Sequence, residues 1–434
     1  GEVQREREKK MDVDEPETGA PSVFNTALSI GAVFPPPIQK DRDPPRVESL
    51  DFHRSGRLLL SADSDSNLVQ IDVLTGAAVK RFTYSGKHAV GIARYTHHEQ
   101  AVLCTGRPGD RSARSGGGHA PGSHDAATVH DVRYLSLYDN SVQRSFHGHG
   151  DAITALSMCP SDDGFATGSK DRSVRIWNLK SSKALATLRL PATSGAPRVA
   201  YDPTGKVLAA TYLETSPGME GGGGTNIIKL YDARNYGTGP FTTFALDSST
   251  VAKFLETSSE DGSAVDPGQA GELSRLEWTD LCFSPDESYL LVSGRQGLLL
   301  LLDAFDGNLV HAFKHPPAGP GPASSTAEEK TSGFLGGACF TPDGKHVVAA
   351  GGPGLEGEVG IWPVPDPPPE PDDQGGDITP AAADAPKSSF PVRRLQGHPG
   401  AVGCVACSPT YNVIASGCAA VGLWTEGVGG GSGD

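Results

Sequence analysis

Apolar and polar residues alternate along most of this chain, in short runs that are separated by turns. The clearest example spans residues 147–180, which open with a Gly-His pair and end at Trp177-Asn178 before a closing Leu-Lys. Alternation with a period of two, broken by a turn about every six to ten residues, predicts short antiparallel strands. A Gly-His pair followed about thirty residues later by a Trp-Asp-like pair is typical of one blade of a WD-type β-propeller.

The same pattern recurs, and each copy has two markers: an apolar residue before its first turn and a pair at the Trp-Asp position. The first markers are Phe52, Tyr95, Met158, Tyr201, Phe283, Phe340 and Cys407. The pairs are Ile71-Asp72, Tyr138-Asp139, Trp177-Asn178, Tyr231-Asp232, Leu302-Asp303, Ile361-Trp362 and Leu423-Trp424. Seven copies predict an all-β fold, a seven-bladed WD-repeat β-propeller. An isolated apolar segment, residues 26–34, belongs to no copy and is available to close the ring.

Composition divides the chain into one large domain and two tails. Residues 1–24 mix charges with Pro, Gly and Ser and carry few apolar residues, which predicts a disordered N-terminal tail. Residues 25–426 are predicted to form the propeller, and the Gly-rich residues 427–434 a flexible C-terminal tail. The propeller carries low-complexity inserts whose place between strands predicts surface loops, at about 107–128, 214–225, 247–276, 316–332 and 365–390.

The net charge argues against a nucleic-acid partner, and the cysteines indicate the environment in which the protein works. The net charge is −15, whereas a protein that binds nucleic acid without sequence preference needs a basic surface, so no direct nucleic-acid partner is expected. The chain has 7 Cys, an odd number, with no signal-peptide pattern and no apolar stretch of about eighteen residues. These features predict a soluble protein with free thiols and no membrane partner.

The third copy is the only one with the full set of polar residues expected of a WD blade. We expect a buried network in which the indole of Trp177 contacts Thr167, Thr167 contacts His149, and His149 contacts Asp171. The seventh copy keeps three equivalents, His398, Ser416 and Trp424, but lacks the Asp. The third copy is therefore predicted to be the most rigid part of the ring.

Basic residues mark a candidate partner-binding face. The turns at the Asp171 position share one face of a propeller, and they carry Lys170, Arg172 and Arg295. Such groups pair with phosphorylated or acidic peptides. The alternative for each residue is an ordinary solvated charged turn.

Other motifs argue against metal binding and catalysis. Cys404 and Cys407 form a C-x-x-C, but no second pair or helix start accompanies them, and Cys407 takes the core position of Phe283 and Phe340. No metal and no cofactor is therefore predicted. Some propellers are enzymes with carboxylates in the central channel, but inner-strand segments such as 153–155 and 281–283 predict an apolar lining. We expect a protein that is not an enzyme.

Beyond the generic repeat, several short sequence segments closely resemble those of one family. VRYLSLYDN at 132–140 and LLLLDAFDGNLVHAF at 299–313 are not consensus features of a WD repeat. Further phrases lie at 91–98, 155–179, 227–244 and 277–286. Together they resemble the WD-repeat protein 82 family, which includes yeast Swd-two. The similarity runs from about residue 28 to about residue 424, with gaps at the inserts.

This resemblance implies a function that composition and spacing do not show. The family is a non-catalytic scaffold of COMPASS, the nuclear complex that methylates lysine 4 of histone H3, and docks peptide segments of partner subunits. In fungi it also belongs to the cleavage and polyadenylation factor, which acts in mRNA 3'-end processing and transcription termination. The implied partners are the N-terminal segment of the SET-domain methyltransferase, phosphatase-module subunits of that factor, and the phosphorylated tail of RNA polymerase II. Alternatives are a phosphopeptide reader of that tail, and a propeller adaptor of another nuclear complex.

Overall fold

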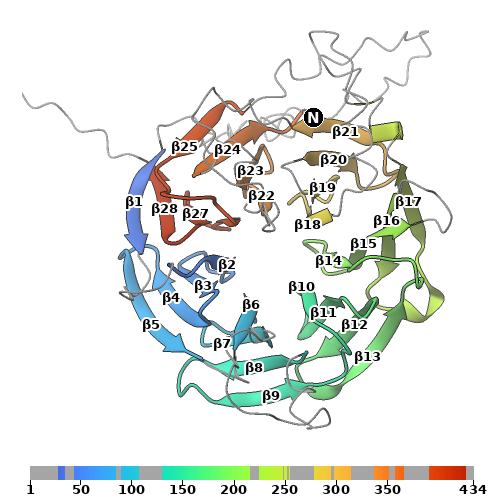
Figure 1. Cartoon of the computed structure of the whole chain (residues 1–434), viewed down its shortest axis with the longest axis horizontal. Coiled ribbons are helices and arrows are strands. Elements are labelled where there is room, and N and C mark those ends of the chain that lie inside the picture. Colours follow the sequence, from blue (N-terminus) through green and yellow to red (C-terminus); the bar gives the residue numbers. More distant parts are fainter. Residues whose placement is uncertain are drawn as a thin grey trace, which may run out of the picture.

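The computed structural model describes strands that form a closed ring (Figure 1). The residues it describes are 28–34, 44–84, 89–106, 130–215, 224–247, 249–251, 254, 278–294, 298–313, 337–350, 357–365 and 391–426. They build seven antiparallel sheets of four strands each, arranged as blades around a central channel. The predicted all-β, seven-bladed propeller is confirmed.

Six blades are meanders of consecutive strands, ordered from the channel outward. Blades one and two contain β2 (Val47–Phe52), β3 (Leu58–Asp63), β4 (Asn67–Asp72) and β5 (Ala77–Thr83), then β6 (Val90–Tyr95), β7 (Ala101–Gly106), β8 (Val132–Ser136) and β9 (Val142–Phe146). Blade three contains β10 (Ile153–Met158), β11 (Gly164–Ser169), β12 (Ser173–Asn178) and β13 (Ser181–Arg189). Blade four contains β14 (Arg198–Tyr201), β15 (Val207–Thr215), β16 (Gly224–Asp232) and β17 (Thr242–Asp247), with the 3-10 helix η5 (Tyr236–Thr238) before β17.

The remaining strands complete the ring. Blade five contains β18 (Trp278–Phe283), β19 (Tyr289–Gly294), β20 (Leu299–Asp303) and β21 (Leu309–Phe313). Blade six contains β22 (Ala338–Phe340), β23 (His346–Ala350), β24 (Glu358–Pro363) and β25 (Arg393–Gln396). Blade seven contains β26 (Cys404–Cys407), β27 (Ile414–Gly417) and β28 (Val421–Glu426), and its outer strand is β1 (Leu28–Phe34). Because β1 pairs with β28, a strand from near the start of the chain closes the ring, as the isolated apolar segment suggested.

The hydrophobic core lies between the blades. All six residues of β3 are buried, whereas the outer strand β5 is mostly exposed. A single four-stranded sheet cannot cover both of its own faces, so the neighbouring blade must supply the cover. In the described residues the apolar side chains fall into seven clusters, and each cluster joins two adjacent blades. The stability of the propeller therefore depends on an unbroken ring.

Strand pairing corrects three of the predicted Trp-Asp positions. Trp177 pairs with Phe165 in blade three, and the equivalent residue of blade two is Leu135, which pairs with Val102. The predicted residue, Tyr138, instead lies in the following turn and is 84% exposed. The Tyr138-Asp139 pair belongs to a turn and only resembles a Trp-Asp pair. It lies three residues after Leu135, which occupies the equivalent position. In blades six and seven the prediction was one residue early, because Trp362 and Trp424 themselves occupy the position.

The predicted tails and most of the inserts lie outside the described residues. This applies to 1–24, 107–128, 316–332 and 427–434, and to almost all of 247–276 and 365–390. Two inserts contribute to the fold at their edges. Val251 is buried in the cluster between blades four and five. Strands β15 and β16 pair as far as Thr215 and Gly224, so they take up both ends of the segment 214–225.

Candidate functional site

Turns alternate between the two ends of the ring, because each blade folds back and forth (Figure 1). The turns between first and second strands and between third and fourth strands lie at one end, which we call the odd-turn face. The turns between second and third strands, together with the links between blades, lie at the other end, which we call the even-turn face. Each face, and the channel that joins them, is a candidate site.

Blade three brings its four expected polar residues together. Trp177 Nε1 donates to Thr167 Oγ1 at 2.9 Å, and Thr167 Oγ1 lies 2.7 Å from His149 Nε2. His149 Nδ1 lies 2.9 Å from Asp171 Oδ2. Ser173, which the sequence analysis did not include, donates to Asp171 Oδ1 at 2.7 Å. A serine two residues after an Asp in a turn is the signal that was available for it.

The electrostatics of this network follow from burial and hydrogen bonding. Burial lowers the pKa of His149, although Asp171 opposes this effect. Burial by itself raises the pKa of Asp171, but hydrogen bonds from Ser173, the Gly150 amide and His149 outweigh it and lower that pKa to about 2. The folded blade therefore favours a neutral imidazole next to an ionised carboxylate.

Blade seven contains a related network with a thiol in it. Trp424 Nε1 donates to Ser416 Oγ at 2.6 Å, and Ser416 Oγ lies 2.6 Å from His398 Nε2. The other ring nitrogen, His398 Nδ1, lies 3.0 Å from Cys418 Sγ. Cys418 thus contacts the imidazole atom that Asp171 contacts in blade three. Burial lowers the pKa of His398.

We expect mild acid to destabilise the fold through these two histidines. Both pKa values are lowered in the folded chain, whereas an unfolded chain titrates histidine near about 6.5. Below that pH the unfolded chain binds more protons at these two histidines, so they decrease the free energy of unfolding as the pH falls. The urea midpoint should be lower at pH 5.5 than at pH 7.5, and His149→Asn combined with His398→Asn should flatten the difference. A difference between the two pH values that is the same in the double variant as in the native chain would contradict this expectation.

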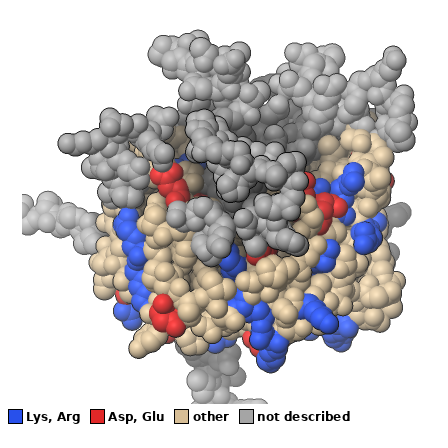
Figure 2. Space-filling view, turned by 60° about the horizontal axis from the view of Figure 1, so that its bottom comes forward, with Lys and Arg blue, Asp and Glu red and all other residues tan. Residues whose placement is uncertain are grey.

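The candidate basic face is described in part. Lys170 and Arg172 lie on the even-turn face in one turn of blade three, and both are exposed. Arg172 Nη1 donates to the Ala192 carbonyl at 2.9 Å, which holds its guanidinium against the blade. The third predicted residue, Arg295, lies outside the described residues. Figure 2 shows Lys and Arg side chains spread over the outer surface of the ring. On β13, Lys183 and Arg189 are exposed.

The odd-turn face carries exposed aromatic rings that the sequence analysis missed. Among the described residues, the exposed Phe and Tyr side chains all lie at this end: Tyr138, Phe241, Phe305 and Tyr411. Phe305 is 88% exposed. The two turns of blade five, residues 284–288 and 303–308, contain four carboxylates and no Lys or Arg: Asp286, Glu287, Asp303 and Asp306. A large aromatic residue inside a polar turn was the signal available in the sequence.

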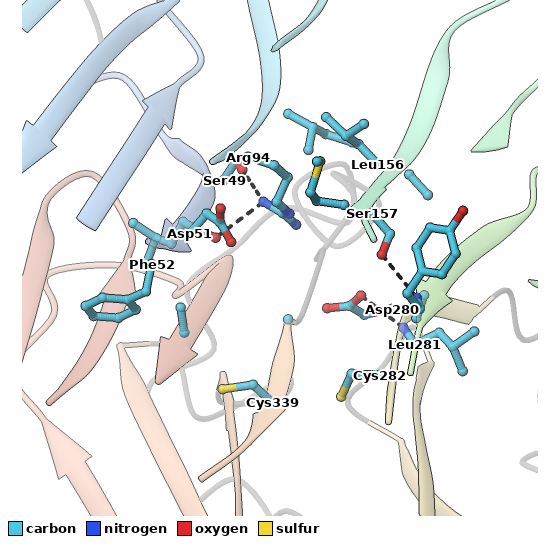
Figure 3. Close-up of a pocket in the computed structure, with 18 of the residues that line it drawn as sticks. Ser49, Asp51, Phe52, Arg94, Leu156, Ser157, Asp280, Leu281, Cys282 and Cys339 are labelled. Atoms are coloured by element: carbon cyan, nitrogen blue, oxygen red, sulfur yellow. Dashed lines mark hydrogen bonds between the residues drawn. The ribbon is translucent and has the colours of Figure 1, made fainter. Parts of the chain in front are cut away.

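The central channel is a cavity of about 660 Å³, lined by the seven inner strands. Its wall includes three carboxylates and three guanidinium groups, from Glu48, Asp51, Asp280, Arg54, Arg94 and Arg198. Figure 3 shows Asp51 and Arg94 on one side of the channel and Asp280 with Cys282 on the other. The expectation of an apolar lining is therefore correct only for part of the wall. It rested on the apolar members of each inner strand, whereas the residues between them also reach the channel.

The charged groups of the channel link neighbouring blades. Arg94 Nη1 donates to Ser49 Oγ at 2.7 Å and to the Leu50 carbonyl at 3.3 Å, so it joins blade two to blade one. Asp51 Oδ2 accepts the Tyr95 amide at 2.6 Å across the same interface. Burial raises the pKa of Asp51 to about 6, against the opposing effects of Arg94 and this amide.

Arg198 extends this linkage over three blades. Its Nε donates to the Trp278 carbonyl of blade five at 3.2 Å, and its Nη1 donates to the Thr154 carbonyl of blade three. The channel side chains thus hold inner strands together. In the part of the chain that the structure describes, no group of three or more His, Cys, Asp and Glu is placed to hold a metal ion.

Comparison with known proteins places the chain in a family. The model for "WD domain, G-beta repeat" matches residues 140–178 and 389–419. The chain is 27% identical to WD repeat-containing protein 82 of Drosophila melanogaster over 380 residues, 87% of this chain and 90% of that protein. It is 30% identical to Protein ANTHESIS POMOTING FACTOR 1 of Arabidopsis thaliana over 322 residues, 74% and 76% of the two chains. The chain belongs to the WD repeat-containing protein 82/SWD2 family.

Membership in the WD repeat-containing protein 82/SWD2 family confirms the resemblance seen in the sequence. COMPASS component SWD2 of Saccharomyces cerevisiae is 28% identical over 329 residues, 75% of this chain and 78% of that protein. Among the described residues of this chain, there is no helix with the length and apolar character needed to cross a membrane.

Proposed function

We propose that the chain is a non-catalytic WD-repeat subunit of COMPASS, acting in the nucleus as a scaffold for histone H3 lysine-4 methylation. The observation that carries this proposal is the similarity to COMPASS component SWD2 along 75% of the chain. The geometry is consistent with a scaffold, because Arg94 and Arg198 link inner strands rather than flank a nucleophile. A role in the fungal cleavage and polyadenylation factor is part of the same proposal and rests on the family resemblance alone.

The proposed mechanism is rigid display of turns that dock peptide segments. A partner segment needs an anchor, and exposed aromatic residues are frequent anchors at interfaces. Phe305 offers such an anchor, and the surrounding carboxylates favour a partner segment that carries Lys or Arg. We propose this odd-turn surface of blade five as the docking site for a basic segment N-terminal to the SET domain of the methyltransferase.

A second candidate function uses the opposite end of the ring. Lys170 and Arg172 are exposed on one turn of the even-turn face. Two basic side chains at that spacing are able to pair with a phosphorylated peptide, such as the phosphorylated tail of RNA polymerase II. This candidate predicts a higher affinity for phosphorylated than for plain peptide.

Co-purification separates the two faces. Tagged native chain should recover the SET-domain methyltransferase, and Phe305→Ala combined with Asp306→Asn should reduce recovery about tenfold, since the pair removes the anchor and part of the charge. Leu185→Ala, at another exposed apolar residue on β13, is the matched control and should recover the native amount. Lys170→Glu tests the even-turn face.

The outcomes are distinct. Loss of recovery with Lys170→Glu but not with the Phe305 and Asp306 variant would move the docking site to the even-turn face and support the phosphopeptide candidate. If the native chain recovers neither methyltransferase nor polyadenylation-factor subunits, the COMPASS proposal is wrong.

A further inference from the structure

Of the cysteines that line the central channel, three are partly exposed, and they lie on one side of it. Cys282, Cys339 and Cys407 belong to the inner strands β18, β22 and β26 of blades five, six and seven, and each is partly exposed to the cavity. Two of these thiols touch, because Cys339 Sγ lies 3.4 Å from Cys407 Sγ. They are 68 residues apart in the chain and are brought together by the contact of β22 with β26. Figure 3 shows Cys339 and Cys282 at the channel wall.

The C-x-x-C motif gives the wrong partner for Cys407. Residues three apart on a strand point to opposite faces of the sheet. Cys404 accordingly faces blade one, where its Sγ lies 3.7 Å from the Val47 carbonyl, while Cys407 faces Cys339 of blade six. The motif is therefore not a functional pair, and the spatial pair has no sequence signature.

We propose that Cys339 and Cys407 form an oxidisable dithiol, which hydrogen peroxide converts into a disulfide joining the inner strands of blades six and seven. A disulfide needs a sulfur–sulfur distance of about 2 Å, so the two sulfur atoms must approach by a little over 1 Å. Side-chain rotation on two adjacent strands is able to supply this movement. The open channel gives the oxidant a route to both sulfur atoms.

The chemistry proceeds in two steps. The Cys339 sulfur attacks one peroxide oxygen and the O–O bond breaks, which gives a sulfenic acid on Cys339 and one molecule of water. The Cys407 sulfur then attacks the sulfenic sulfur, the S–O bond breaks, and a second water leaves with the Cys407 proton. Two thiols lose two electrons and two protons in total, and hydrogen peroxide is reduced by two electrons.

The rate of oxidation follows from the environment of the two thiols. The hydrogen bond with Cys339 and burial both raise the pKa of Cys407 well above its usual value, which favours the protonated thiol. A thiol held in its protonated form reacts slowly, so oxidation should accelerate as the pH is raised. The bond would cross-link two blades at the channel and leave both turn faces unchanged. The proposal is therefore independent of the proposed function.

Peptide mapping tests the proposal on the full chain. The reduced protein is treated with hydrogen peroxide, remaining thiols are blocked with N-ethylmaleimide, and tryptic peptides are identified by tandem mass spectrometry without reduction. Trypsin leaves Cys404, Cys407 and Cys418 in one peptide, residues 395–434, so fragmentation of that peptide assigns the bonded cysteine. The expected product is a Cys339–Cys407 cross-linked peptide that dithiothreitol removes, and the melting temperature of the oxidised protein should rise by about 5–10 °C. Cys404→Ser is the matched control and should form the same cross-link.

Several results would overturn the proposal. A Cys404–Cys407 or Cys282–Cys339 cross-link as the main product would contradict it. So would a result in which Cys339 and Cys407 both stay free to react with N-ethylmaleimide. The mapping of the native chain does not depend on any variant. Cys339→Ser and Cys407→Ser should each abolish the rise in melting temperature, and a rise that persists in both would also contradict the assignment.

Discussion

Replacing Trp177 with alanine is expected to lower the free energy of unfolding by about 4–5 kcal/mol, near the upper end for a buried aromatic residue. The indole is fully buried, stacks on Phe165 with ring centroids 6.2 Å apart, and meets Phe146 of blade two edge-on. It also donates to Thr167, so its loss removes one partner from a buried network. Urea unfolding followed by far-ultraviolet circular dichroism measures the change without relying on Trp fluorescence.

Matched positions in other blades are the control for this experiment. Ile71 and Leu302 are fully buried at the equivalent position of blades one and five, and truncation to alanine there should lower stability by about 2–4 kcal/mol. Trp177→Phe keeps most of the ring but not the donor, and should lower it by about 1–2 kcal/mol. If Trp177→Ala is no more harmful than Ile71→Ala once side-chain volume is considered, the polar network adds nothing to stability.

Removing residues 1–34 is expected to destabilise the whole ring, by about 5 kcal/mol or more. The deletion takes away β1, which is the outer strand of blade seven. Its apolar residues pack into both neighbouring interfaces: Ala32 and Phe34 against the cluster shared with blade one, and Leu28 against the cluster shared with blade six. Each such contact is worth about 1–2 kcal/mol, and the exposed edge of β28 adds unpaired backbone groups. Thermal unfolding followed by circular dichroism should show a lower and broader transition.

A shorter deletion separates ring closure from a tail effect. Removing only residues 1–24 leaves β1 in place and should leave the melting temperature unchanged within about 1 °C. A synthetic peptide of residues 25–36, added to the longer deletion, should raise the melting temperature in a concentration-dependent way, because it binds only the folded ring. If both deletions melt like the full chain, then β1 does not stabilise the propeller.

The local sequence pattern was sufficient to identify the seven blades, but it did not decide which residues pair between neighbouring strands. Alternating residues and turns identified all seven copies, because strands and turns depend on neighbours in sequence. The Tyr138-Asp139 pair was misplaced, because turn chemistry and the end of a strand give similar local signals. Only the pairing of Leu135 with Val102 decides which residue is buried.

The candidate site also contains features that the local sequence predicts and features that depend on contacts between distant residues. His149, Thr167, Asp171 and Trp177 were identifiable because a single blade supplies all of them within about thirty residues. The exposure of Phe305 was not, since it depends on which neighbouring turns leave its ring uncovered. The charged channel was also missed, because its wall takes three to five residues from each of seven strands that lie far apart in the sequence.

By itself, the sequence determined that this protein is a seven-bladed propeller, which strand is available to close it, and which family it resembles. These properties follow from the periodicity of apolar residues and from short sequence segments that are specific to the family. The tertiary structure alone decided that Arg94 and Arg198 join blades across the channel, that Cys407 faces Cys339 rather than Cys404, and that aromatic rings gather on the odd-turn face. The physical reason is that side chains in adjacent blades meet through the closure of the ring, at separations of about 44–80 residues, over which no local pattern carries information.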